Sequence, residues 1–443
     1  MPTTYRPYQP NQTLLLPPSV SEWLPDDHLA HFINDAVDAL DLQAFHARYE
    51  GDGRRNTPFD PAMLVKVVVY GYANGVVSSR QVARKLHEDV AFRVLAAENF
   101  PAHRTIREFR QVHREALAGL FVQVVKLAHE SGLLKLGRVG IDGTKLKANA
   151  SKRKAMSYSR MQSEELRLKA EIAALLQQAE ATDQKEDAQF GADRTGEELP
   201  DELARRETRL ATIQAAKTRL ETRQREADKA AGREPGDDAP KPGKRGPAFK
   251  RPFGEPPAKA QENFTDSDSR IMRTADGYQQ GYNAQAAVDE SLLIVAATVS
   301  NIASDNPQLI PVLEQIRCTV GQLPTMLLAD AGYASEANFV ALEDANQTAC
   351  VALGREEKTS QRSINPTTHP ATARMHTRMT SDEGKAHYRR RKTLPEPVFG
   401  WLKSIVGITR FCGRGLLSVQ AEWPLICASM NLRRMHKMGW QPV

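Results

Sequence analysis

Three acidic residues flank predicted buried elements, and their chemistry suits metal-dependent reactions of phosphates. Asp142 follows the apolar run RVGI within GRVGIDGT, which predicts a short strand over 137–144. Asp330 follows the apolar run MLLA, and Glu396 precedes a helix that we expect to begin at Pro397. An aspartate at the carboxyl end of a buried strand points into a crevice. Carboxylates gathered there would suit Mg²⁺, and two such ions can drive phosphodiester hydrolysis.

Each of these acids, taken alone, also has an ordinary structural explanation. Asp142 could cap a turn through the DGT sequence, and Asp330 could cap the helix that follows it. Glu396 could neutralise the arginines beside it or favour a helix dipole. The chain holds 54 Asp and Glu residues, so an acid near a strand end is common. The order of the elements around all three acids is what favours a shared site.

Cationic residues gather in two short segments. RRRK, residues 389–392, lies directly before Glu396, and KPGKRGPAFKR, residues 241–251, contains no acid. The formal net charge is +6 and the sequence pI is near 9.0. Clustered cations favour a polyanion because binding releases its condensed counterions; a solvated surface is the alternative. Cations around Glu396 would hold a polyanionic substrate against it, since carboxylates alone would repel one.

Residues 1–135 are predicted to form an all-helical domain. Ser78 and Gln81 have the spacing of a capping box at the start of one helix over 78–96. A second helix is expected from about Thr105, after a break at NFPAH. Two helices joined by a tight turn, the second rich in arginine, are typical of a helix-turn-helix that reads DNA. A purely structural bundle fits the same pattern. The candidate DNA contacts are Arg104, Arg107 and Arg110.

The sequence after the helical domain predicts an α/β domain built from 136–144 and 276–443. Apolar runs at 281–289 and 291–300 predict a strand pair joined by a tight turn. Further elements are a helix over 305–320, a strand over 325–333, a helix over 335–345, a strand over 348–354, and two closing helices over about 397–408 and 416–438. This order predicts a mixed sheet with flanking helices.

A helical insertion interrupts that domain after its first strand. Apolar residues at heptad spacing, beginning at Met161 and at Leu203, predict two helices that pack on each other within 145–230. In the first of these helices, Glu165 is the single residue at a heptad position that is not apolar. Residues 231–275, with their Pro, Gly and Lys content, are predicted to form a linker.

The sequence favours a cytoplasmic protein without a membrane partner. No run of about 18 apolar residues is present, and the first residues lack the pattern of a secretory signal. The four cysteines show no CxxC pair, so we expect buried thiols in a reducing compartment. They are Cys318, Cys350, Cys412 and Cys427.

Three segments resemble the signature regions of the DDE transposases of bacterial insertion sequences: DGTKLKANASK, LLADAGY and YRRRKTLPEPVFGWLK. LLPPSVSEWLPDDHLAHFI near the start resembles the opening of that group's helical amino-terminal domain. The resemblance implies a ribonuclease H-like catalytic domain whose first, second and third acids are Asp142, Asp330 and Glu396. It also implies two Mg²⁺ ions, with Mn²⁺ as a substitute.

The third signature region of this family has a tyrosine, an arginine, the glutamate and a lysine at set spacings. Tyr388, Arg391, Glu396 and Lys403 would supply them, and six residues separate the last two, as in the family. Four residues separate Arg391 from Glu396, one more than usual, so Lys392 is the alternative for the cation. By resemblance the tyrosine and the cations would contact phosphates of the transposon end; simple packing is the alternative for Tyr388.

These observations predict a transposase that binds the inverted-repeat ends of its own element in double-stranded DNA. It would cleave the ends and join the freed 3′-hydroxyls to target DNA, as a homodimer or higher oligomer at the bacterial nucleoid. A catalytically inactive DNA-binding regulator is the first alternative, and a related nuclease without strand transfer is the second. A coiled-coil adaptor would account only for residues 160–228.

Overall fold

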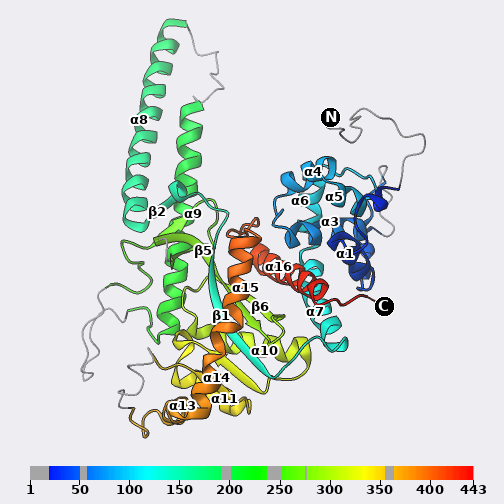
Figure 1. The fold of residues 1–443 in the computed structure, drawn as a ribbon. Coiled ribbons are helices and arrows are strands. Elements are labelled where there is room, and N and C mark those ends of the chain that lie inside the picture. Colours follow the sequence, from blue (N-terminus) through cyan, green and yellow to red (C-terminus); the bar gives the residue numbers. More distant parts are fainter. Residues whose placement is uncertain are drawn as a thin grey trace, which may run out of the picture.

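The computed structural model describes residues 19–49, 57–190, 201–236, 251–274, 277–354 and 364–442. The first 18 residues of the predicted helical domain and residues 241–250 of the basic segment lie outside the described residues. Figure 1 shows a helical amino-terminal part, a long helical pair and a part that contains the sheet. Within these described ranges, no helix has the length and apolarity needed to cross a membrane.

The amino-terminal part is helical, as predicted, and packs around the buried helix α3. Its elements are η1 (Val20–Trp23), α1 (Leu29–Asp38), α2 (Gln43–His46), η2 (Ala47–Tyr49), α3 (Pro61–Ala73), α4 (Ser79–Glu88), α5 (Val90–Leu95), α6 (His103–Val112) and α7 (Arg114–Glu130). Asp60 caps α3 by accepting from the N–H of Met63 at 3.1 Å, and Pro61 fits its first turn. Nearly all of α3 is buried because α1, α5 and the carboxy-terminal helix α16 (Leu416–Lys437) pack against it.

The single helix predicted over 78–96 is two helices, because Asp89 ends α4 and caps α5. Its carboxylate accepts from the N–H of Ala91 at 3.1 Å. Ser78 does precede α4, but its side chain makes no capping hydrogen bond, so the predicted capping box is wrong. The helix α5 therefore stands between α4 and α6 in place of the tight turn of a helix-turn-helix.

The part that contains the sheet has the ribonuclease H-like mixed sheet that was predicted, with β1 in its centre. Its strands are β1 (Arg138–Lys147), β4 (Arg270–Thr274), β5 (Gly277–Val288), β6 (Ile294–Ser300), β7 (Met326–Ala329) and β8 (Ala349–Val351). β1 pairs antiparallel with β5 and parallel with β7; β6 and β4 flank β5, and β8 flanks β7. The predicted connecting helices are α10 (Leu309–Val320) and α11 (Glu336–Asp344), preceded by η4 (Asn306–Gln308) and η5 (Ala331–Tyr333).

Strand β1 is longer than the predicted strand over 137–144, and Asp142 lies within it. Leu146 is buried and pairs with Tyr282, so the alternation of buried and exposed residues continues to Lys147. The prediction that Asp142 ends a strand is therefore wrong. Residues 145–147, expected in the insertion, belong to the sheet, and so does β4, which was expected in the linker.

The insertion forms a long antiparallel helical pair that projects from the rest of the chain (Figure 1). α8 (Tyr158–Phe190) and α9 (Asp201–Ala230) pack through a small core that includes Met161, Leu168 and Ile213. At its base β2 (Ala155–Ser157) pairs with β3 (Gln261–Asn263). Glu165 joins the helices, because it accepts from Lys217 of α9 at 2.9 Å. The lapse in the heptad is thus an ion pair between the helices.

The carboxy-terminal part contains two helices that were not predicted, α13 (Pro370–Thr380) and α14 (Asp382–Arg389). α15 (Pro395–Gly400) continues into a π-helical turn, Trp401–Ile405, and α16 packs on β6, α7 and α3. The four cysteines are free thiols, and Cys318 is exposed, so the prediction that all four are buried is wrong.

Candidate active site

The register of β1 and β7 brings Asp142 and Asp330 to the same level of the sheet. The two strands are parallel, and Gly140 pairs with Leu328. Asp142 follows Gly140 by two residues, and Asp330 follows Leu328 by two residues and comes directly after β7. Adjacent strands lie about 4.8 Å apart, and equal steps along parallel strands keep the same face. The two aspartates are therefore neighbours at the edge of the sheet where β7 ends.

Asp142 is mostly buried, and its surroundings disfavour its charge. Its side chain is 21% exposed, and its Oδ1 accepts from the N–H of Gly143 at 2.8 Å. The pKa of Asp142 is raised to about 6, mainly because the group is buried; the negative charges of Asp330 and Asp305 also raise it, while the Gly143 N–H and Arg391 lower it. The negative charge around Asp142 thus exceeds what the arginine balances.

Asp330 occupies a tight turn between β7 and η5. Its Oδ1 accepts from the N–H of Gly332 at 2.8 Å, so it caps η5. The cap of the following helix α11 is Ser335, whose hydroxyl accepts from Asn338 N–H at 3.2 Å. Asp330 therefore does not cap α11, the role that was its structural alternative, and its carboxylate stays at the sheet edge beside Asp142.

Gly140 brings the third acid to the face of the sheet that carries Asp142. A Cβ at Gly140 would lie 2.8 Å from Cδ of Pro395 and 3.1 Å from Cβ of Leu394, so the start of α15 rests directly on β1. Gly140 and Asp142 are two residues apart and share a face. The helix begins at Pro395, two residues earlier than predicted, and Glu396 lies in its first turn with 47% of its side chain exposed.

Arg391 lies between the first and third acids. Its Nη2 donates to Oε1 of Glu396 at 3.1 Å, and its Nη1 is 3.6 Å from Oδ2 of Asp142. The residue is 9% exposed, and its Nε is buried without a hydrogen-bond partner. Lys392, the alternative cation, is exposed. Of the two candidate cations, Arg391 is thus the one that faces the acids.

The three acids suit a hard divalent cation but do not form a closed cage. In the described part of the chain, no three His, Cys, Asp or Glu side chains form a group that could hold a metal ion. Asp142 and Asp330 are the adjacent pair, and Glu396 is reached across Arg391. An all-carboxylate donor set is the one that Mg²⁺ and Mn²⁺ prefer, and the excess negative charge around Asp142 favours such an ion.

The remaining cations of the signature region surround the acids with different exposure. Arg389, Arg390 and Lys392 are exposed, whereas Tyr388 and Lys403 are half-buried. Three of the four consecutive cations therefore face solvent, where a phosphate chain could reach them.

Arg110 is largely buried, whereas Arg104 and Arg107 are exposed on α6. Its guanidinium donates to the hydroxyl of Tyr72 and to Val77 O at 2.8 Å, and lies 3.5 Å from Oε1 of the buried Glu422. Glu422 belongs to α16, so Arg110 joins the helical part to the catalytic part. These contacts give Arg110 a structural role, and its contact with DNA stays a prediction.

A buried polar layer beneath β1 was missed in the sequence. It comprises Lys145, Asn283, Gln285, Asp305 and Tyr333, which are joined by hydrogen bonds. Their partners come from segments up to 160 residues apart, so no local pattern reveals the layer. The available signal was Asn and Gln at alternate positions of the otherwise apolar segment GYNAQAAVD.

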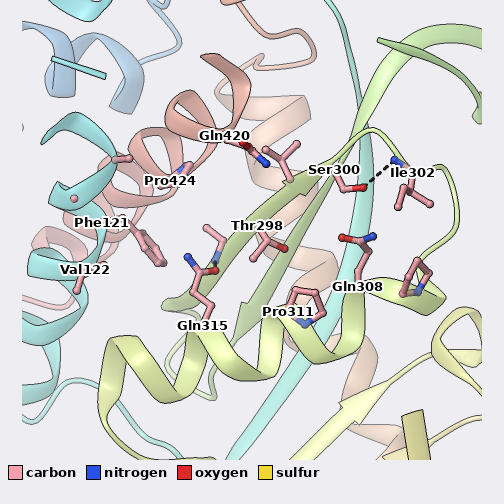
Figure 2. Close-up of a pocket in the computed structure, with 15 residues that line it drawn as sticks. Phe121, Val122, Thr298, Ser300, Ile302, Gln308, Pro311, Gln315, Gln420 and Pro424 are labelled. Atoms are coloured by element: carbon pink, nitrogen blue, oxygen red, sulfur yellow. Dashed lines mark hydrogen bonds between the residues drawn. The ribbon is translucent and has the colours of Figure 1, made fainter. Parts of the chain in front are cut away.

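One cavity in the described part of the chain lies away from these acids. Figure 2 shows this cavity of about 720 Å³, which is lined by residues of α7, β6, α10 and α16, including Thr298, Gln315 and Pro424. Neither the three acids nor Arg391 line it. The acids instead lie at an open sheet edge, which suits a long polymer better than a small enclosed ligand.

Comparison with protein families identifies the chain. Residues 256–432 match the family described as Transposase DDE domain, and residues 18–112 match the family described as Transposase domain (DUF772). The chain belongs to the DDE transposases of insertion sequences. Comparison with curated proteins and with solved structures gave no significant match. The first match includes Asp330 and Glu396, while Asp142 lies outside both.

Proposed function

We propose that this transposase binds the inverted-repeat ends of its own element, cleaves them by Mg²⁺-dependent hydrolysis and joins the 3′-hydroxyls to target DNA. The observation that carries the proposal is the meeting of Asp142 and Asp330 at one level of the sheet, with Glu396 brought to the same face by α15. Transposases act on DNA, and members of this family use divalent metal.

Asp142, Asp330 and Glu396 would hold the divalent ions, which supply an activated water and stabilise the leaving oxygen. Asp142 is ionised at pH 7, since its pKa is about 6. The N–H of Gly143 fixes one of its oxygens. Arg391 contacts both Asp142 and Glu396, so it fixes the third acid relative to the first.

The exposed cations would hold the phosphate chain against the acids. Arg389, Arg390 and Lys392 face solvent beside Glu396, and cations at such positions bind phosphates without reading sequence. We assign Tyr388, Arg391 and Lys403 to the transposon end, as in the family's third signature region. On the helical part, Arg104 and Arg107 are the remaining candidates for contact with the repeats.

Joining two ends requires at least two active sites, so we propose a homodimer or higher oligomer on DNA. DNA as the substrate supports a location with the chromosome in the cytoplasm. Mg²⁺ is the expected ion and Mn²⁺ the expected substitute.

The experiment uses DNA from both flanks of the gene that encodes this chain, end-labelled and incubated with protein, Mg²⁺ and a supercoiled target plasmid. We expect nicks at the flanking repeats and labelled strands joined to the plasmid, both lost in Asp142→Asn and kept in Asp344→Asn. Asp344 is an exposed acid at the end of α11 and gives the same change in charge. Binding without nicking would instead support an inactive regulator, and nicking without joined product would support a nuclease.

A further inference from the structure

Both sheet-edge aspartates are oriented by the N–H group of a glycine. Oδ1 of Asp142 accepts from Gly143 at 2.8 Å, and Oδ1 of Asp330 accepts from Gly332 at 2.8 Å. The direction of each carboxylate therefore depends on where its glycine lies.

The two glycines rest on the same residue, Asp305, which directly precedes η4. A Cβ at Gly143 would lie 2.6 Å from Oδ1 of Asp305. A Cβ at Gly332 would lie 3.5 Å from Cβ of Asp305 and 3.6 Å from its Oδ2. The first distance is shorter than real Cβ contacts, so a larger residue at position 143 would displace the Asp305 carboxylate. Asp305 thus contacts β1, which carries the first acid, through Lys145, and lies beside the turn that carries the second.

Asp305 is held in place from three sides. Its Oδ1 accepts from Nζ of Lys145, Nδ2 of Asn283 and Nε2 of Gln285, each at 2.8 Å. Asn283 and Gln285 are fully buried, and Lys145 is 17% exposed. Asp305 itself is 27% exposed, but its displacement would leave the buried amides of Asn283 and Gln285 without this acceptor, which disfavours such a movement.

Gln285 extends the network to the turn that carries Asp330. The hydroxyl of the fully buried Tyr333 donates to Oε1 of Gln285. The Asp305 carboxylate can only accept, so Nε2 of Gln285 must face it and Oε1 must face Tyr333. Asn338 donates to Tyr333 O at 2.7 Å and to Asn306 O at 2.8 Å, which ties η5 to η4. The position of the second acid is therefore coupled to Asp305 through side chain and backbone.

We propose that Asp305, Gln285 and Tyr333 form a positioning layer that sets the separation and direction of Asp142 and Asp330. The layer acts through the two glycines. This inference rests on the proposed function, in which the two acids hold the divalent ions that cleave DNA. It assigns function to residues outside the three acids and the signature cations.

The test compares Asp305→Asn, Tyr333→Phe and the control Asp344→Asn with the wild type. Mn²⁺ binding without DNA is measured by electron paramagnetic resonance, and end cleavage and end binding are measured separately, all well below each variant's melting temperature. Tyr333→Phe keeps the charge and removes one hydroxyl, so it separates positioning from simple loss of a negative charge. Changes beside metal ligands typically reduce metal affinity or activity 10- to 100-fold.

We expect Asp305→Asn and Tyr333→Phe each to weaken Mn²⁺ binding about tenfold and to slow cleavage 10- to 100-fold. Both variants should bind end DNA within about twofold of the wild-type affinity. Asp344→Asn should match the wild type in all three measurements. Wild-type Mn²⁺ affinity in Tyr333→Phe would overturn the proposal, even if Asp305→Asn bound poorly, since charge alone would then explain the effect. If the wild type bound Mn²⁺ but did not cleave, the proposed function would fail, while weaker Mn²⁺ binding in both variants would still support the positioning layer.

Discussion

Replacing Asp142 with asparagine should stabilise the protein at neutral pH in the absence of divalent ions. The folded state raises the pKa of Asp142 from its ordinary 3.8 to about 6, so the folded protein holds this proton more tightly than the unfolded chain. Rising pH therefore destabilises the fold between these two values, and the full penalty remains above pH 6. At about 1.4 kcal/mol per pH unit the penalty is at most ~3 kcal/mol. The raised pKa already includes the attraction between Asp142 and Arg391, so we expect a gain of about 2–3 kcal/mol.

The assay is guanidinium unfolding in EDTA, followed by tryptophan fluorescence, at pH 8 and pH 5. Trp423 is a suitable probe because it is buried and its Nε1 donates to Gln285 O at 2.8 Å. Asp142→Asn should be more stable than wild type at pH 8, and the pH-dependent part of this gain should fall by about half at pH 5. Asp344→Asn serves as the control for charge. A variant less stable than wild type at pH 8, or an equal gain at both pH values, would refute the reasoning.

Three further substitutions test the packing that supports the site. Gly140→Ala should lower the stability by about 1–3 kcal/mol and displace α15, because the added Cβ would lie 2.8 Å from Cδ of Pro395 at the helix start. The melting temperature and the rate of end cleavage should both fall. Arg110→Met should lower the stability by about 3 kcal/mol, because it leaves the buried Glu422 carboxylate without its cation. In the control Arg107→Met, at an exposed position, the stability should change by less than about 0.5 kcal/mol. Equal effects of the two substitutions would contradict the role of the buried ion pair. Glu165, whose hydrogen bonds with lysines lower its pKa to about 2, stabilises the helical pair above about pH 4.5 and loses this effect as pH falls toward 2. Glu165→Gln should speed amide exchange in α8 and α9 about fivefold at pH 7, as measured by mass spectrometry, with no change in the sheet.

Much of the sheet could be predicted because its signals are local. The strands β6, β7 and β8 are short apolar runs, and the apolar residues of α10 and α11 have helical spacing. The helices α13 and α14 were missed because their exposed, polar sequence shows few apolar positions. The end of β1 was misjudged because DGT resembles a turn, although the following TKLK alternates as a strand does.

The candidate site was only partly predictable, because its geometry depends on distant contacts. Strand ends suggested Asp142 and Asp330, but their common level follows from the register of two strands that lie about 190 residues apart in the sequence. Arg110 was placed on a DNA-facing surface because its partner Glu422 is 312 residues away. Asp305 gave no local signal, since its role depends on Gln285 and on two glycines in other segments.

The most direct test of the shared site is the anomalous diffraction of Mn²⁺ in crystals of the protein with cleaved end DNA. The account predicts a peak within about 2.0–2.6 Å of carboxylate oxygens of both Asp142 and Asp330, with Glu396 at that ion or at a second one beside it. An ordered complex in which Mn²⁺ binds elsewhere, or in which Asp142 and Asp330 share no ion, would contradict it.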